Sequence, residues 1–261
     1  MPEELERANA LQEARQLYAK HSWQGAFEAL RRLDEEEELA TPDLEKLVWS
    51  GALVGDEKAY LQHLERLYHR HVDAETSLAA ARSAFWLGFR LMTLGESARG
   101  AAWLGRSQQL VDAQAENCVE AGYLLLAPIQ RQLMAGDFSS AADTASRAAA
   151  IGEEFSEPDL MALGRQLEGR ALIQSGRVDE GMALLDESML AAASGELSPI
   201  VTGIIYCSLI ASCQRVFALG RAREWTAALS KWCEAQPELV TFRGSCQVHR
   251  SEILQLAGEW R

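Results

Sequence analysis

Apolar residues recur at intervals of three and four along most of the chain, which is the spacing of one helix face. β-Branched residues are sparse and no hairpin dipeptide separates alternating runs, so we predict an all-α chain of paired helices. The first helices of the pairs are predicted at residues 3–20, 42–54, 75–94, 114–135, 158–175, 199–219 and 237–257. The second helices are predicted at residues 22–38, 56–72, 97–112, 138–154, 178–194 and 221–235.

Glycines mark the predicted turn between the two helices of a pair. They stand 38 to 44 residues apart, and each follows an apolar-periodic run. Because glycine readily adopts the left-handed conformation that ends a helix, this series predicts a repeating unit of two helices joined by a turn. The six glycines are Gly55, Gly95, Gly136, Gly176, Gly220 and Gly258.

Pro128 falls inside the predicted helix 114–135, where it predicts a kink.

A single pair of amphipathic helices cannot bury both of its apolar faces, whereas a stack of pairs can. We therefore predict a right-handed α-solenoid of six to seven antiparallel helix pairs, forming one domain over residues 1–261. The segment Gly258–Arg261 matches the opening of the second helix at Gly220–Trp225. Because solenoids normally finish with a polar capping helix, we expect a fragment truncated within its last repeat. A short complete protein whose open end is covered by a self-contact or by a partner is the alternative.

The charge balance argues against a nucleic-acid-binding surface. The chain has 25 Lys and Arg against 38 Asp and Glu, a net charge of −13, so it does not favour phosphate contacts. Its five cysteines are odd in number and scattered, which favours a reducing compartment such as the cytoplasm. Neither a signal peptide nor an apolar run long enough for a membrane span is visible.

Small residues recur at matching places in the predicted pairs. When the repeats are aligned on their turn glycines, Leu87–Gly88 and Glu168–Gly169 fall at one position of the first helix. Gly100, Ala141 and Gly181 fall at one position of the second. These positions match the leucine-glycine and small-residue positions of the tetratricopeptide (TPR) motif. The units thus resemble TPR repeats that are longer than the usual period of about 34 residues.

The last third of the chain carries a more particular resemblance. The segments concerned are Gly195–Pro199, Tyr206–Ser208, Arg223–Thr226, Trp232–Cys233, Phe242–Gly244 and Val248–Glu252. They resemble the helical-repeat region of bacterial LuxR-type (MalT-like) transcriptional regulators. The resemblance implies a sensor or oligomerisation array that works with a separate DNA-binding or cyclase output domain. The sequence itself contains no DNA-binding helix-turn-helix motif and no ATPase motif.

Motifs of catalysis are absent from the sequence. It has no phosphate-binding loop, no Gly-x-Ser-x-Gly, no His-Glu-x-x-His and no Cys-x-x-Cys, so we predict neither enzyme activity nor a cofactor. His69 and His71 are two residues apart and point to different sides of a helix, which argues against a shared metal ion.

The first helices of stacked TPR-like pairs line a concave groove, and their exposed positions give the candidate ligand-binding residues. Aromatic groups together with guanidinium and amide groups suit a peptide or a small amphipathic molecule, whose carboxylate or phosphate Arg82 and Arg170 could bind. The alternative is that the aromatic groups are inter-repeat core and that the arginines pair with neighbouring acids. The candidate residues are Arg82, Phe85, Phe89, Tyr123, Gln130, Gln166, Arg170, Gln174, Gln214 and Glu252.

Two functions are compatible with these features. The first is a ligand- or protein-sensing array of a LuxR-type regulator, which contacts neither DNA nor a membrane directly. The second is a free-standing TPR adaptor that binds other proteins. Pairing of two copies through the open C-terminal end is compatible with either function.

Overall fold

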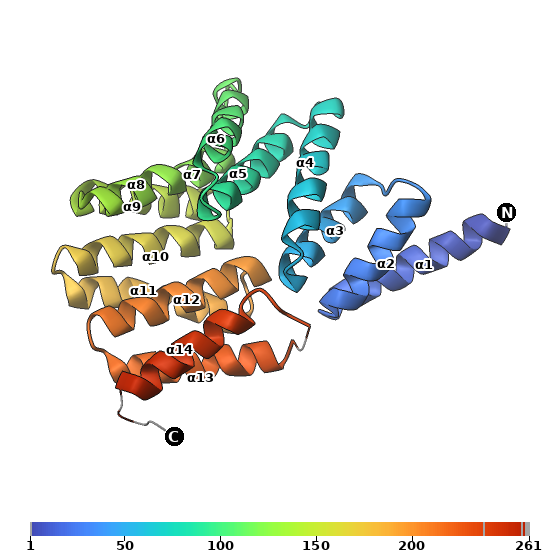
Figure 1. Cartoon of the computed structure of the whole chain (residues 1–261). Coiled ribbons are helices and arrows are strands. Elements are labelled where there is room, and N and C mark those ends of the chain that lie inside the picture. Colours follow the sequence, from blue (N-terminus) through green and yellow to red (C-terminus); the bar gives the residue numbers. More distant parts are fainter. Residues whose placement is uncertain (1, 237, 257, 259–261) are drawn as a thin grey trace.

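The computed structural model describes residues 2–236, 238–256 and 258, and these residues form fourteen α-helices and no strand (Figure 1). The first seven helices are α1 (Pro2–Ala19), α2 (Trp23–Glu36), α3 (Thr41–Val54), α4 (Glu57–Asp73), α5 (Ser77–Thr93), α6 (Ser97–Asp112) and α7 (Val119–Leu124). The others are α8 (Leu126–Ala135), α9 (Phe138–Glu154), α10 (Pro158–Gln174), α11 (Val178–Ser194), α12 (Pro199–Arg215), α13 (Leu219–Glu234) and α14 (Arg243–Leu256).

Consecutive helices pack as antiparallel pairs, and the pairs stack into a curved array (Figure 1). Each pair joins a first helix to the helix that follows it, from α1 and α2 through to α12 and α13. Helix α14 packs on both α12 and α13 and is the first helix of a seventh unit. The predicted α-solenoid of six to seven TPR-like pairs is therefore confirmed.

The turn glycines behave largely as predicted. Gly55, Gly95, Gly136 and Gly176 all have positive φ, between 78° and 92°, and each ends a first helix. Gly220 was assigned to this role wrongly, because it lies inside α13. The left-handed position in that turn is taken by Phe217, with φ of 56°.

The fourth first helix is interrupted, and it begins later than predicted. Residues 113–118 lie outside the helices, so the predicted start at residue 114 is wrong and α7 begins at Val119. Leu125 separates α7 from α8, three residues before Pro128. Proline has no N–H to donate to the carbonyl four residues earlier, and its ring crowds that carbonyl, so the helix breaks there. The predicted kink is confirmed as a division into two helices.

Glycines also set the distance between paired helices. A Cβ built on Gly88 would lie 2.9 Å from the backbone oxygen of Gly100, and one built on Gly181 would lie 2.5 Å from that of Gly169. Real side chains do not approach backbone so closely, so only glycine permits these crossings. The positions aligned with the TPR motif in the sequence are thus the positions where the helix backbones meet.

We predict that Gly181→Ala lowers the free energy of unfolding by about 2 kcal/mol, because the added methyl group would push α10 and α11 apart. Thermal or urea unfolding measures the change. The matched control is Gly105→Ala in α6, where an added Cβ meets nothing within 4 Å. This control should gain about 0.5–1 kcal/mol from the higher helix propensity of alanine. Equal effects of the two substitutions would contradict a tight crossing at Gly181.

The array is closed across its concave side by the segment between α13 and α14. In Figure 1 this segment extends from the C-terminal helices toward the turn between α1 and α2. Its Val240 and Thr241 amides donate hydrogen bonds to the carbonyl oxygen of Leu53, at 3.0 and 3.3 Å. The predicted first helix 237–257 is therefore wrong at its start, since α14 begins at Arg243. Pro237 and Ala257 lie outside the described residues.

Candidate functional site: the groove along α12

Helix α12 forms one wall of the groove, and three cavities lie along it. Two of them, of about 300 and 450 Å³, share Trp86 and Ile200 and form one hollow between the N-terminal repeats and α12. The third, of about 280 Å³, lies further along α12 beside Cys207, Ser208 and Arg215. A ligand lying along α12 would therefore contact repeats from both halves of the chain.

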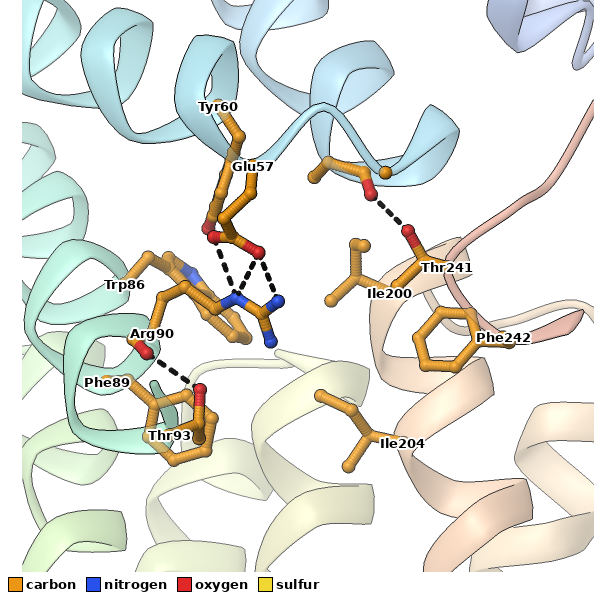
Figure 2. Close-up of a pocket in the computed structure, with 12 residues that line it drawn as sticks. Glu57, Tyr60, Trp86, Phe89, Arg90, Thr93, Ile200, Ile204, Thr241 and Phe242 are labelled. Carbon is orange, nitrogen blue, oxygen red and sulfur yellow. Dashed lines mark hydrogen bonds and ion pairs between the residues drawn. The ribbon is translucent and has the colours of Figure 1, made fainter. Parts of the chain in front are cut away.

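The first part of the hollow combines an ion pair with apolar walls (Figure 2). Nε of Arg90 donates to both carboxylate oxygens of Glu57, at 2.9 and 3.0 Å, and Nη2 also contacts that carboxylate. Burial raises the pKa of Tyr60 beside them, so this hydroxyl stays protonated. Apolar side chains enclose the rest of the space, namely Trp86, Phe89, Ile200, Ile204 and Phe242. This part of the hollow suits an apolar group that carries a hydrogen-bonding head.

The second part of the hollow is largely aromatic. Trp49 meets Trp86 edge-on with ring centroids 5.7 Å apart, and Tyr123 lies 6.0 Å from Trp86. Tyr18 closes the same space from α1. Asp159 accepts a hydrogen bond from the backbone N–H of Ser198 at 2.8 Å, while burial raises the pKa of its carboxyl group.

Arg82 lies beside this hollow but is held by carboxylates of the chain itself. Its Nη2 donates to Glu120 at 3.1 Å and its Nη1 donates to Glu157 at 3.0 Å. The guanidinium also lies 4.0 Å from the ring centre of Tyr123, whose hydroxyl donates to Glu157 at 2.7 Å. This network joins α5, α7 and the start of α10, so we infer a structural role for Arg82, while its ligand-binding role stays a prediction.

Arg170 is in a different position. It lines the third cavity with Arg215, and neither guanidinium has a carboxylate partner among the residues that the structure describes. Burial and the neighbouring positive charge of Arg215 lower the pKa of Arg170. Gln174 and His249 line the same cavity. Two such arginines beside one cavity make an electropositive spot in a chain of net charge −13.

The other predicted residues differ in where they lie. Phe85 and Gln166 are buried in the packing between helices and line none of the three cavities. Phe89, Tyr123 and Gln174 do line cavities. Gln214 donates to Glu252 at 3.1 Å and so joins α12 to α14. Gln130 is partly buried in α8 and lines none of these cavities.

The central groove residues Glu57, Trp86 and Arg90 were not predicted from the sequence. On α5 the predicted face was Arg82, Phe85 and Phe89, whereas Trp86 and Arg90 lie one residue further round the helix. The concentration of Trp49, Tyr60 and Trp86 in adjacent helices was the available signal. Aromatic side chains of this size rarely gather without enclosing either core or ligand.

The described part of the chain contains no group of three or more residues placed to hold a metal ion. Burial raises the pKa of Cys213 to about 11 and that of Cys233 to about 12, which keeps both thiols protonated and unreactive. Among the described helices, none is both long and apolar enough to cross a bilayer.

Comparison with known proteins finds distant similarity to solved structures. No protein-family model matches the sequence, and a search of curated proteins finds no match. Among solved structures, the TPR-like repeats of a kinesin light chain from Podosopora anserina are 14% identical. That match covers 73% of this chain and 96% of the other, with a TM-score of 0.46.

A second solved structure is the TPR2AB domain of yeast Sti1 in a complex with pHSP90. It is 13% identical, with 97% of each chain covered and a TM-score of 0.36. Both TM-scores lie below 0.5. The description of the chain as TPR-like therefore rests on the helix pairs and glycine crossings described above.

We predict that Arg82→Ala lowers the free energy of unfolding by about 2 kcal/mol, because it leaves the carboxylate of Glu120 buried without its charged partner. Adding Glu120→Gln to that variant should recover part of the loss, because it removes the uncompensated charge. The control is Arg99→Ala, which breaks an exposed pair with Glu96 and should change stability by less than about 0.5 kcal/mol. Urea unfolding measures all three. Equal stability of the parent and Arg82→Ala would contradict a structural role for this arginine.

Proposed function

We propose that the chain is a non-catalytic TPR-like interaction and sensor module that binds a peptide or a small-molecule effector along α12. In this proposal it serves as the repeat region of a bacterial LuxR-type transcriptional regulator and acts in the cytoplasm. The output domain that binds DNA would be a separate part of such a regulator, and this segment would make no direct contact with nucleic acid.

The proposal rests on one observation, that α12 carries apolar side chains at one cavity and a cationic side chain at another. Ile200 and Ile204 of α12 face the aromatic hollow, and Arg215 of the same helix lines the cavity with Arg170. A molecule with an apolar body and an acidic end would bury the body against Trp86 and Phe89. Its acid could then form charge-assisted hydrogen bonds with the two arginines, which gain the counter-ion that the described chain does not supply.

The alternative function is an adaptor that docks other proteins in the same groove. It is supported by the segment 238–242, which already lies across the groove and hydrogen-bonds to it through main-chain groups. Both functions use the concave side of the array. They differ in whether binding changes the state of a linked output domain.

The groove is tested with 1-anilinonaphthalene-8-sulfonate, an aromatic anion whose fluorescence rises in apolar surroundings. We predict saturable binding to the parent protein and an affinity about tenfold lower in Arg170→Ala and in Arg215→Ala, a loss of about 1.4 kcal/mol. The melting temperature should stay the same or rise slightly, because each substitution relieves the repulsion between two arginines.

The matched control is Arg165→Ala. Arg165 lies on α10 like Arg170, but it pairs with Glu187 of α11 at 3.2 Å. This substitution should leave dye affinity unchanged. Equal loss in the Arg165 and Arg170 variants, or no loss in either, would contradict a binding site at the arginine cavity.

A further inference from the structure

The segment between α13 and α14 supplies hydrogen-bond partners to the ends of helices in distant repeats. The carboxylate of Glu238 accepts hydrogen bonds from the Ser22 hydroxyl, at 3.1 and 3.2 Å, and from the backbone N–H of Gln24 at 2.8 Å. These donors lie at the N-terminus of α2, where Ser22 makes no side-chain cap of its own. A negative charge there is also favoured by the helix dipole.

The same segment also donates hydrogen bonds to carbonyl oxygens at the C-terminal end of α3. The carbonyl oxygen of Leu53 accepts from the amides of Val240 and Thr241, and the Thr241 hydroxyl donates to the carbonyl oxygen of Ala52 (Figure 2). Carbonyls in the last turn of a helix lack the donors of a following turn, so the segment running past this end supplies donors to them.

Side chains fix the segment at both of its ends. The indole N–H of Trp23 donates to the side-chain oxygen of Gln236 at 3.0 Å, and both residues are buried. At the other end, Phe242 packs over Gly203, where a Cβ would lie 2.3 Å from the ring. Leu239 between them is fully buried. The segment is thus held by main-chain hydrogen bonds together with buried side chains, and bound peptides are held by the same two kinds of contact.

We propose that Ser22–Gln24 and Ala52–Leu53 form a docking surface for a short protein segment outside any helix or strand, kept occupied in cis by residues 238–242. The partner that fits is a segment with a carboxylate side chain, followed by apolar and β-branched residues and an aromatic ring. Such a segment on another protein competes with residues 238–242 and opens the closed array of repeats. This inference deepens the proposed function, on which it rests for the use of the groove, by naming the chemistry of a protein partner.

The test uses the full chain and a fluorescein-labelled peptide of residues 236–242. The double variant Glu238→Gln with Thr241→Val removes the charge at α2 and the hydroxyl bond to α3 while keeping side-chain shape. We expect amide exchange at Val240 and Thr241 to become at least about tenfold faster in this variant. The labelled peptide should bind it at least about tenfold tighter than it binds the parent, measured by fluorescence anisotropy.

Two controls separate docking from general loosening. Glu234→Gln makes the same charge change at an exposed position at the end of α13 and should alter neither exchange nor peptide binding. A labelled peptide with Glu238→Gln should bind the double variant at least about fivefold more weakly than the natural sequence does, because it lacks the carboxylate for α2.

Three results would overturn the inference. Exchange at Val240 and Thr241 in the parent could match that of an unstructured peptide, or it could stay unchanged in the double variant. Exchange could also accelerate while the peptide binds no better. Dye binding at the arginine cavity is measured on the same proteins. Dye binding without peptide binding leaves the proposed function intact, whereas peptide binding without dye binding removes the arginine site alone.

Discussion

The whole architecture depends on how closely the backbones of paired helices approach one another. At the crossings of Gly88 with Gly100 and of Gly169 with Gly181, one helix touches the backbone of the next, with no room for a side chain. This contact fixes the distance within a pair, and larger side chains such as Leu91 and Leu185 then fill the space on either side. Because the spacing recurs along the chain, the pairs stack with similar geometry and leave one continuous concave side.

Two arginines of first helices, Arg82 on α5 and Arg170 on α10, illustrate how charge is used on that concave side. Arg82 is surrounded by Glu120 and Glu157, so its charge holds neighbouring repeats together. Arg170 instead lies beside the guanidinium of Arg215, and burial together with this like charge lowers its pKa. A partly buried cation without a counter-ion costs stability, and proteins commonly keep such groups where a ligand supplies the missing charge. The difference between the two arises from the residues around them and not from the arginines themselves.

Local pattern was enough to predict the helix pairs, most turn glycines and the glycine crossings, because each depends on residues within one or two helices. The groove lining was predicted less well. On α5 the prediction was wrong by one residue, which is about 100° around the helix. It selected Phe85, which is buried between helices, whereas Trp86 lines the cavity. The position of residues 238–242 across the groove could not be predicted, because Glu238 and its partner Ser22 are 216 residues apart in the sequence.

The segment between α13 and α14 also changes how the array of repeats should unfold. In an open stack each repeat contacts only its neighbours, so terminal repeats can fray while the centre stays folded. Here the bonds from Gln236, Glu238 and Thr241 tie the last repeats to the first two. Neither end can unfold without breaking contacts to the other. The chain thereby gains the cooperativity of a globular domain, together with a long-range closure that slows its folding.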